Sequence, residues 1–171
     1  MLRPIRLMAF VLLVLSTLLL VSPAFAQDAS DAYAITPMST SWVVLHGHRY
    51  NVEIAQTTAQ RARGLMSRDR MANDRGMLFI HDSEEPLAYW MKNTMIALDI
   101  FYFDANRRLV SVSKRTPPCT LGDGCPPYRS AGPALYVLEL NSGAADHLHV
   151  KKGDRLTFGP NIPTTPAPTQ P

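Results

Sequence analysis

The chain has 171 residues and a formal net charge of +3, from 17 basic and 14 acidic side chains. Its composition, with 46% hydrophobic and 18% charged residues, excludes an intrinsically disordered chain and a protein that crosses a membrane many times. Two cysteines are too few for a disulfide-rich miniprotein, and they do not form a zinc site by themselves.

Residues 1–26 have the three parts of a secretory signal peptide. Arg3 and Arg6 precede an apolar run, and the small-x-small sequence Ala24-Phe25-Ala26 follows it. An anchoring helix needs roughly 20 apolar residues, and this run is shorter. We therefore favour cleavage before Gln27 over retention as an anchor, and we expect a periplasmic or secreted protein. Cleavage leaves 15 basic and 14 acidic side chains, a net charge of +1, which indicates no nucleic-acid-binding surface.

The mature chain divides into three parts by composition. Residues 27–40 are small, polar and aperiodic, which predicts a flexible lead-in. Residues 160–171 contain five prolines and almost nothing apolar to bury, so we expect an extended, solvated tail. The segment 41–159 has no internal repeat and is long enough for one globular domain.

Strand-like alternation dominates this globular segment. In chain order it predicts a hairpin over 42–55, a short helix over 57–66, an apolar strand over 76–80, a strand over 87–94, a second hairpin over 98–114, a strand over 134–140, a short helix over 141–148 and a last strand over 155–158. The segment 116–132 is rich in proline and glycine, which predicts a loop. These elements predict an α+β, β-rich fold: a single compact domain, closed or nearly closed as a β-barrel, with two or three short helices.

Short motifs are spread along the whole globular segment. They are Gly64-Leu65-Met66 with Arg68, Gly76-Met77-Leu78-Phe79, Trp90-Met91-Lys92-Asn93-Thr94, Leu98-Asp99-Ile100, Cys125 with Tyr128 and Ser130, Val137-Leu138-Glu139, Gly143 and Gly153-Asp154. Together they resemble a family of small bacterial and archaeal proteins, the domain-of-unknown-function family 192. The resemblance extends over 42–158 and implies a compact, β-rich and often exported domain; it implies no particular reaction or ligand.

Three charged residues occupy strands that otherwise have the pattern of buried strands. By strand alternation, Asp99 shares a face with aromatic residues, Glu139 with aliphatic residues, and Lys92 with Trp90. An isolated buried charge is costly, so such groups form ion pairs, shift their pKa or line a pocket. Either a structural ion pair or a polar pocket therefore explains them. We expect Lys92 to lie close to Asp99 or Glu139, beside Trp90 and the loop that contains Tyr128.

Two functions are compatible with such a pocket. In the first, the protein is a non-catalytic ligand- or partner-binding module of the cell envelope, with the binding residues Trp90, Lys92, Asn93, Asp99, Tyr128 and Glu139. Lys92 then meets an anionic group, Asn93 orients it, and Trp90 supplies an apolar or stacking wall. In the second, it is an envelope hydrolase or lyase with Asp99 or Glu139 as general base and Lys92 as electrostatic stabiliser. No nucleophile elbow or P-loop motif is present, so we assign no catalytic residue.

The remaining candidate ligands are sulfur and imidazole groups. Cys119 and Cys125 enclose five residues, and an oxidising compartment predicts a disulfide between them. Methionine and histidine side chains make a copper-binding protein a weaker alternative, but the methionines have the spacing of core residues and the histidines fall at turns. We assign no metal site and expect no cofactor. The expected partner is an unknown small molecule or envelope component, and the expected state is a monomer that binds neither nucleic acid nor, after cleavage, a membrane.

Overall fold

The structure is a computed structural model that describes residues 38–164. The predicted signal peptide at 1–26 lies outside the described residues, as do residues 27–37 of the lead-in and 165–171 of the tail. Within the described part of the chain, no helix is long and apolar enough to cross a membrane. Cleavage before Gln27 and the periplasmic or secreted location therefore stay predictions.

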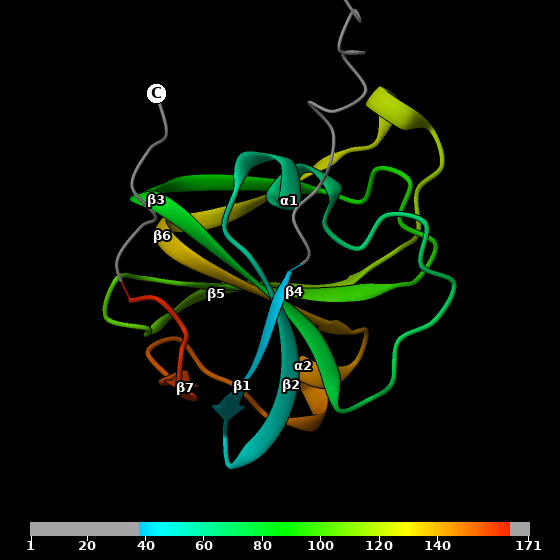
Figure 1. The fold of residues 1–171 in the computed structure, drawn as a ribbon. Coiled ribbons are helices and arrows are strands. Elements are labelled where there is room, and N and C mark those ends of the chain that lie inside the picture. Colours follow the sequence, from blue (N-terminus) through cyan, green and yellow to red (C-terminus); the bar gives the residue numbers. More distant parts are fainter. Residues whose placement is uncertain (1–37, 165–171) are drawn as a thin grey trace, which may run out of the picture. The chain divides into compact units, whose positions relative to one another are not determined.

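Seven strands form one sheet in the order β5-β4-β6-β3-β2-β1-β7 (Figure 1). The strands are β1 (Ser39–Leu45), β2 (His48–Ala55), β3 (Arg75–Trp90), β4 (Leu98–Phe103), β5 (Leu109–Thr116), β6 (Pro127–Asn141) and β7 (Thr157–Phe158). β2 and β3 are parallel, which requires a crossover, and the short helix α1 (Thr58–Arg63) lies in it. A second helix, α2 (Ala144–His147), and a 3₁₀ turn, η2 (Gly122–Gly124), follow later in the chain. The β-rich α+β domain with two short helices is confirmed.

The sheet is bent into an open half-barrel. β3 and β6 pair along most of their length, and their register shifts at two places between Ile80 and Ala88. Bulges of this kind bend a strand and increase its twist. β5 and β7 are the two ends of the strand order, and a bridge joins Arg108 to Arg155 between them. The prediction was a closed or nearly closed barrel, and the strand pairing shows an open half-barrel.

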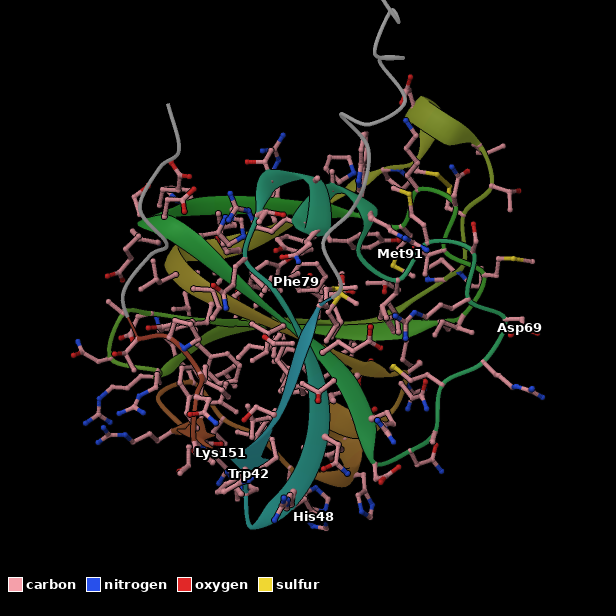
Figure 2. The ribbon with its side chains drawn as sticks, in the orientation of Figure 1. Trp42, His48, Asp69, Phe79, Met91 and Lys151 are labelled. Carbon is pink, nitrogen blue, oxygen red and sulfur yellow. A yellow bond between two sulfur atoms is a disulfide. The ribbon has the colours of Figure 1, made fainter. Side chains whose placement is uncertain are left out.

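Apolar side chains pack on both faces of this sheet. One cluster contains Phe101 of β4 and Ala145 of α2. The other contains Phe79 of β3 and Tyr102 of β4, and Met91 belongs to it. Figure 2 shows Phe79 and Met91 inside the fold. All six residues of β4 are buried because this strand lies between the two clusters.

The described ends of the chain pack on the sheet. β1 begins at Ser39, inside the segment expected to be a lead-in. At the other end, the Ser41 hydroxyl donates a hydrogen bond to the Pro160 carbonyl oxygen (2.7 Å), and Ile162 is buried in the core. The composition predicted a solvated tail from Pro160 onward. Ile162 departs from that expectation because it is the large apolar side chain of the segment.

Candidate functional site

A cleft of about 260 Å³ opens between α1, β3 and the turn that follows β3. It is lined by Thr58, Arg61, Ala62, Arg63, Gly64, Leu65, Met66, Phe79, His81, Ala88, Tyr89, Trp90, Lys92, Thr94 and Glu139. The motifs at 64–66, 76–79, 90–94 and 137–139, which carry the family resemblance, each contribute to this lining. Segments that are far apart in the sequence therefore meet at one concave site.

Glu139 reaches the cleft from β6. The residue is 4% exposed, and its carboxyl group makes no hydrogen bond or ion pair with any described residue. No polar side-chain atom in the described part is both sealed from solvent and unpartnered, so the carboxyl oxygens open onto the cleft. Burial raises the pKa of Glu139 to about 8. The group is therefore mostly uncharged at pH 7.

Gly76 determines how closely β3 approaches Glu139. A Cβ atom at Gly76 would lie 2.7 Å from the carbonyl oxygen of Glu139 and 2.6 Å from the side chain of Leu140. Both contacts are too short for a real Cβ atom, so only glycine fits between these strands. The close approach holds β6, and with it Glu139, directly against the strand that forms one wall of the cleft.

His81 and Tyr89 form a half-buried, hydrogen-bonded pair in the cleft. The Nε2 atom of His81 lies 2.8 Å from the Tyr89 hydroxyl oxygen, and the two groups share a hydrogen bond. Burial, assisted by the charge of Arg61, lowers the pKa of His81 to about 4. Burial also raises the pKa of Tyr89 well above its ordinary value, and the neighbouring carboxylate of Glu139 acts in the same direction. Both members of the pair are uncharged at pH 7.

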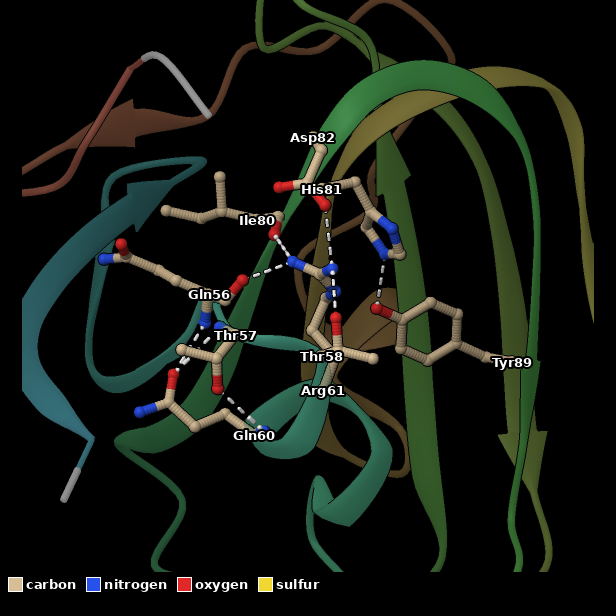
Figure 3. Close-up of polar contacts among 9 residues, drawn as sticks. All are labelled: Gln56, Thr57, Thr58, Gln60, Arg61, Ile80, His81, Asp82 and Tyr89. Carbon is tan, nitrogen blue, oxygen red and sulfur yellow. Dashed lines mark hydrogen bonds and ion pairs between the residues drawn. The ribbon is translucent and has the colours of Figure 1, made fainter. Parts of the chain in front are cut away.

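Arg61 fixes α1 against β3 (Figure 3). Its guanidinium donates to the backbone carbonyl oxygens of Gln56 and Ile80, the latter at 3.0 Å, and pairs with Asp82 at 3.0 Å. The helix begins with a capping box, in which Thr57 and Gln60 each accept a hydrogen bond from the other's backbone N–H at 3.1 Å. The N-cap of this helix is thus Thr57, the first residue of the range 57–66 predicted for it. Because both the start and the middle of this short helix are held, it forms a fixed wall of the cleft.

Lys92 and Trp90 lie at the rim. The Lys92 ammonium is 4.9 Å from the centre of the Trp90 ring, and its Nζ atom is 2.5 Å from Oδ1 of Asp123. Asp123 lies in the loop closed by the disulfide between Cys119 and Cys125, whose sulfur atoms are 2.07 Å apart. Cys119 also forms backbone bridges with Lys92 and Thr94. The predicted disulfide is present in the structure, and its loop borders the cleft.

Asp99 belongs to a different site from the one predicted. It is completely buried, and its carboxylate accepts hydrogen bonds from the backbone N–H groups of Arg115 (2.7 Å), Ala145 (2.8 Å) and Gly143 (3.1 Å). These contacts tie β4 to the end of β5 and to the start of α2. Lys92 shares the cleft lining with Glu139, one of its two expected neighbours, but its ion pair is with Asp123. Asp99 is a structural carboxylate.

Asn93 and Tyr128 also lie outside the lining of the cleft, and both act through their backbones. Asn93 is exposed with φ 53°, a left-handed conformation that asparagine tolerates, and its carbonyl oxygen accepts a hydrogen bond from the Ser67 N–H (2.9 Å). The carbonyl oxygen of Tyr128 accepts the Tyr102 hydroxyl at 2.8 Å. Of the predicted binding residues, the cleft brings together Trp90, Lys92 and Glu139.

Four residues with titratable side chains in the cleft were missed by sequence reasoning: Arg61, Arg63, His81 and Tyr89. A signal for His81 was present, because it follows Phe79 by two positions and strand alternation places both on one face. We ended that strand at Ile80, whereas β3 continues to Trp90. Arg61 and Arg63 have no comparable signal, since a solvated helix face carries arginines equally well.

The histidines and methionines do not gather at the cleft, apart from His81 and Met66. His46 is 2.5 Å from Asp154, and His48 packs edge to face on His147, with ring centres 5.3 Å apart. In the part of the chain that the structure describes, no three His, Cys, Asp or Glu side chains are placed to hold a metal ion. A larger, open cleft of about 520 Å³ adjoins His48 and His147, but its polar side chains, Tyr50 apart, are at least partly exposed.

Comparisons with known proteins give a family and two related structures. Residues 42–158 match the family DUF192, described as Uncharacterized ACR. A Sinorhizobium meliloti 1021 protein described as a candidate transcription regulator is 34% identical, with a TM-score of 0.66 over 72% of this chain and 96% of that one. A protein of unknown function from Novosphingobium aromaticivorans DSM 12444 is 32% identical, with a TM-score of 0.65 over 73% of this chain and 94% of that one. No curated protein matches the chain.

Proposed function

Because the chain belongs to DUF192, an uncharacterised family, we propose its function from the cleft: it is an exported, non-catalytic ligand-binding module of the cell envelope. The observation that carries the proposal is Glu139, a buried carboxyl group that opens onto the cleft and has no partner in the described chain. The expected signal peptide and the disulfide support export. In this proposal, the ligand forms the hydrogen bond that the Glu139 carboxyl group does not form within the described chain.

Energetic reasoning supports a ligand at this position. Burial disfavours the ionised form of the Glu139 carboxyl group, and an apolar residue at position 139 would avoid that cost. Binding sites in proteins combine mostly apolar walls with a few polar groups that fix the ligand's orientation. The cleft has this composition: Leu65, Met66 and Phe79 are apolar, whereas Glu139 and the His81–Tyr89 pair supply polar atoms. Trp90, which is 45% exposed, adds an aromatic surface at the rim.

The description of the Sinorhizobium relative concerns that protein, and charge leads us to a different proposal here. Binding to DNA or RNA draws most of its affinity from an excess of basic side chains against phosphates. The mature chain would carry 15 basic and 14 acidic side chains. A small-molecule ligand therefore fits this chain better than a nucleic acid.

Two substitutions on α1 test the site. Ala62 lines the cleft, and Ala59 is exposed on the same helix outside the lining. The purified protein is screened by thermal unfolding against sugars, amino acids and small carboxylates. A ligand at 100 times its Kd adds about 2.7 kcal/mol to the free energy of unfolding. We expect such a ligand to stabilise the wild type and Ala59→Phe but not Ala62→Phe. If every stabilising compound acts equally on Ala62→Phe, the cleft is not the binding site.

The pKa of Glu139 favours an enzyme as the second candidate. A carboxyl group that is protonated near neutral pH and open to a cleft suits a general acid of a hydrolase or lyase. Glu139 is the carboxyl group in the lining of this cleft, so the pair of carboxylates that most glycosidases use is not assembled by the described residues. Catalysis would be established if the NMR spectrum of a bound compound showed signals of a reaction product. These product signals should be absent with Glu139→Gln, while the compound still binds to that variant.

A further inference from the structure

The lining of the cleft carries more positive than negative charge. Three of its side chains, Arg61, Arg63 and Lys92, are cations, and Glu139 is its carboxyl group. Arg61 is occupied by Asp82 and by backbone carbonyl oxygens. Lys92 is paired with Asp123, whose side chain is 85% exposed, and such solvated ion pairs are weak. Arg63 has no ion-pair partner among residues 38–164. A negative group entering the cleft would thus meet two cations at the rim.

Glu139 contributes a hydrogen-bond donor to the same space. A protonated carboxyl group has one O–H donor, whereas an ionised one only accepts. Because burial keeps Glu139 mostly protonated at pH 7, an acceptor on the ligand satisfies it best. A hydrogen bond from a neutral acid to an ionised acceptor is also among the stronger ones in proteins. The O–H donor of Glu139 and the cations of Arg63 and Lys92 thus favour the same kind of group on the ligand, a negatively charged hydrogen-bond acceptor.

We propose that the ligand of this cleft carries a carboxylate, which accepts a hydrogen bond from the carboxyl group of Glu139 and lies within reach of Arg63 and Lys92. The inference rests on the proposed binding function and adds the chemical class of the ligand. A cationic amine fits poorly, because the rim already holds two cations. Trp90 and Phe79 provide apolar surface for the rest of the ligand.

This arrangement makes binding depend on pH. The titratable and charged groups around Glu139 are Arg61 and Arg63 from α1, His81 and Tyr89 from β3, Lys92 from the following turn and Tyr102 from β4. Burial raises the pKa of both tyrosines and lowers that of His81, so none of these three changes charge between pH 6.5 and 9. The arginines stay charged over the same range. Ionisation of Glu139 is therefore the change expected to expel a carboxylate as pH rises.

Three probes with the same ring and different head groups test the inference: benzoate, benzamide and benzylammonium. Binding to the full protein is followed by the NMR signal of the Trp90 indole N–H group. The variant Ala62→Phe, in which the cleft is blocked, is measured in the same way. At pH 6.5 we expect benzoate to bind at least tenfold more tightly than benzamide. Between pH 6.5 and pH 9, the protonated fraction of Glu139 falls about tenfold, so benzoate affinity should fall by up to about tenfold. Glu139→Gln keeps a donor and removes the titration, so its affinity for benzoate should be the same at both pH values.

Arginine substitutions provide the matched control. Arg63→Gln should weaken benzoate binding about threefold to tenfold, whereas Arg70→Gln, at an exposed position outside the lining, should not. The inference is overturned if no probe binds, if affinity for benzoate is independent of pH, or if the pH dependence persists in Glu139→Gln. If benzamide or benzylammonium binds the cleft more tightly than benzoate, the inference that the ligand carries a carboxylate is wrong, while the proposed binding function stands. The binding function itself fails only in the wider screen against Ala62→Phe.

Discussion

Asp99 and Glu139 lie one position apart in the register of the neighbouring strands β4 and β6, yet their side chains point to opposite faces of the sheet. Ile100 is the residue opposite Glu139, and Leu140 is the residue opposite Asp99. Asp99 is surrounded by three backbone N–H donors, whereas Glu139 faces an open cleft and has no hydrogen-bond or ion-pair partner among residues 38–164. Two carboxyl groups on adjacent strands thus have separate roles, one in holding the fold and one at the candidate site.

Glu139→Gln should change how stability depends on pH. The pKa of Glu139 is raised to about 8 in the folded protein from an ordinary value of 4.5, so the folded state binds a proton that the unfolded state has released. The free energy of unfolding therefore falls as pH rises through this window, by about 5 kcal/mol in total for a shift of that size. Denaturant unfolding from pH 6.5 to 8.5 should show the last part of this fall, about 2 kcal/mol, in the wild type and not in Glu139→Gln.

The control for that measurement is Glu84→Gln, because Glu84 is exposed. His81 acts with the opposite sign: its pKa is lowered to about 4, so its contribution to stability is lost as pH falls from 6.5 towards 4. Measurements above pH 6.5 avoid this effect. A wild type whose stability is constant from pH 6.5 to 8.5 would show that Glu139 is not buried as a neutral acid.

Asp99→Asn should destabilise the protein, because it disturbs the hydrogen bonds that tie β4 to β5 and α2. An asparagine keeps one acceptor oxygen but turns an NH₂ group towards the backbone N–H groups that Asp99 now satisfies. The loss of charged hydrogen bonds and the unpaired donors should lower the free energy of unfolding by about 3 kcal/mol or more. Urea unfolding measures it. Asp69→Asn, at an exposed position (Figure 2), should change stability by less than about 0.5 kcal/mol.

Lys92→Met should leave the protein folded. The partner of Lys92 is the exposed Asp123, so removing the ammonium does not strand a buried charge. We expect a change of less than about 1 kcal/mol in the free energy of unfolding, comparable to Lys114→Met at the surface pair with Asp146. Benzoate binding should weaken in Lys92→Met and stay unchanged in Lys114→Met. A loss of about 3 kcal/mol or more would instead reveal a structural ion pair.

Opening the disulfide should weaken the rim more than the core. A seven-residue ring contributes only about 2 kcal/mol by the chain-entropy argument, and the apolar clusters contain few residues of this loop. The double variant Cys119→Ser and Cys125→Ser should stay folded, with NMR signals of Lys92, Thr94 and Asp123 broadened or shifted. Native protein should resist alkylation until reductant is added. Full labelling of both thiols without reductant would contradict the disulfide.

The protein recovered from the cell envelope should begin at Gln27. The basic start, the apolar run and Ala24-Phe25-Ala26 motivate the prediction. Intact-mass measurement distinguishes the cleaved chain from one that retains residues 1–26. A mass that includes those residues would rule out both cleavage and a free periplasmic or secreted form.

Sequence patterns predicted the strands best where apolar and polar residues alternate regularly. The hairpin of β1 and β2 and that of β4 and β5 were expected near their observed bounds. β3 was divided into two strands because His81 to Pro86 interrupt the apolar pattern, and in the structure this stretch contains the register shifts. β6 begins at Pro127, inside the expected loop, since its first half lies at the surface and one of its faces is only half-buried.

The candidate site was predicted only in part, for a physical reason. Alternation identified Asp99 and Glu139 as charges in buried strands, and both are buried. It could not show which one was satisfied, because the donors to Asp99 come from Arg115, Gly143 and Ala145, all distant in sequence. The crossover that places α1 over β3 is likewise a long-range feature. The contribution of Arg63 and His81 to the cleft depends on it.

The rim of the cleft includes a loop that is closed by a disulfide, so the rim can form later than the sheet. The sheet and its two apolar clusters are complete without the bond, whereas Asp123 is held beside Lys92 by a loop that closes only on oxidation. In a reducing compartment the protein would therefore be folded, but the loop at the rim of the cleft would not be closed. In an oxidising compartment the disulfide would close this loop. The redox state of the surroundings should therefore act on the position of Asp123 beside Lys92 more than on the packing of the sheet.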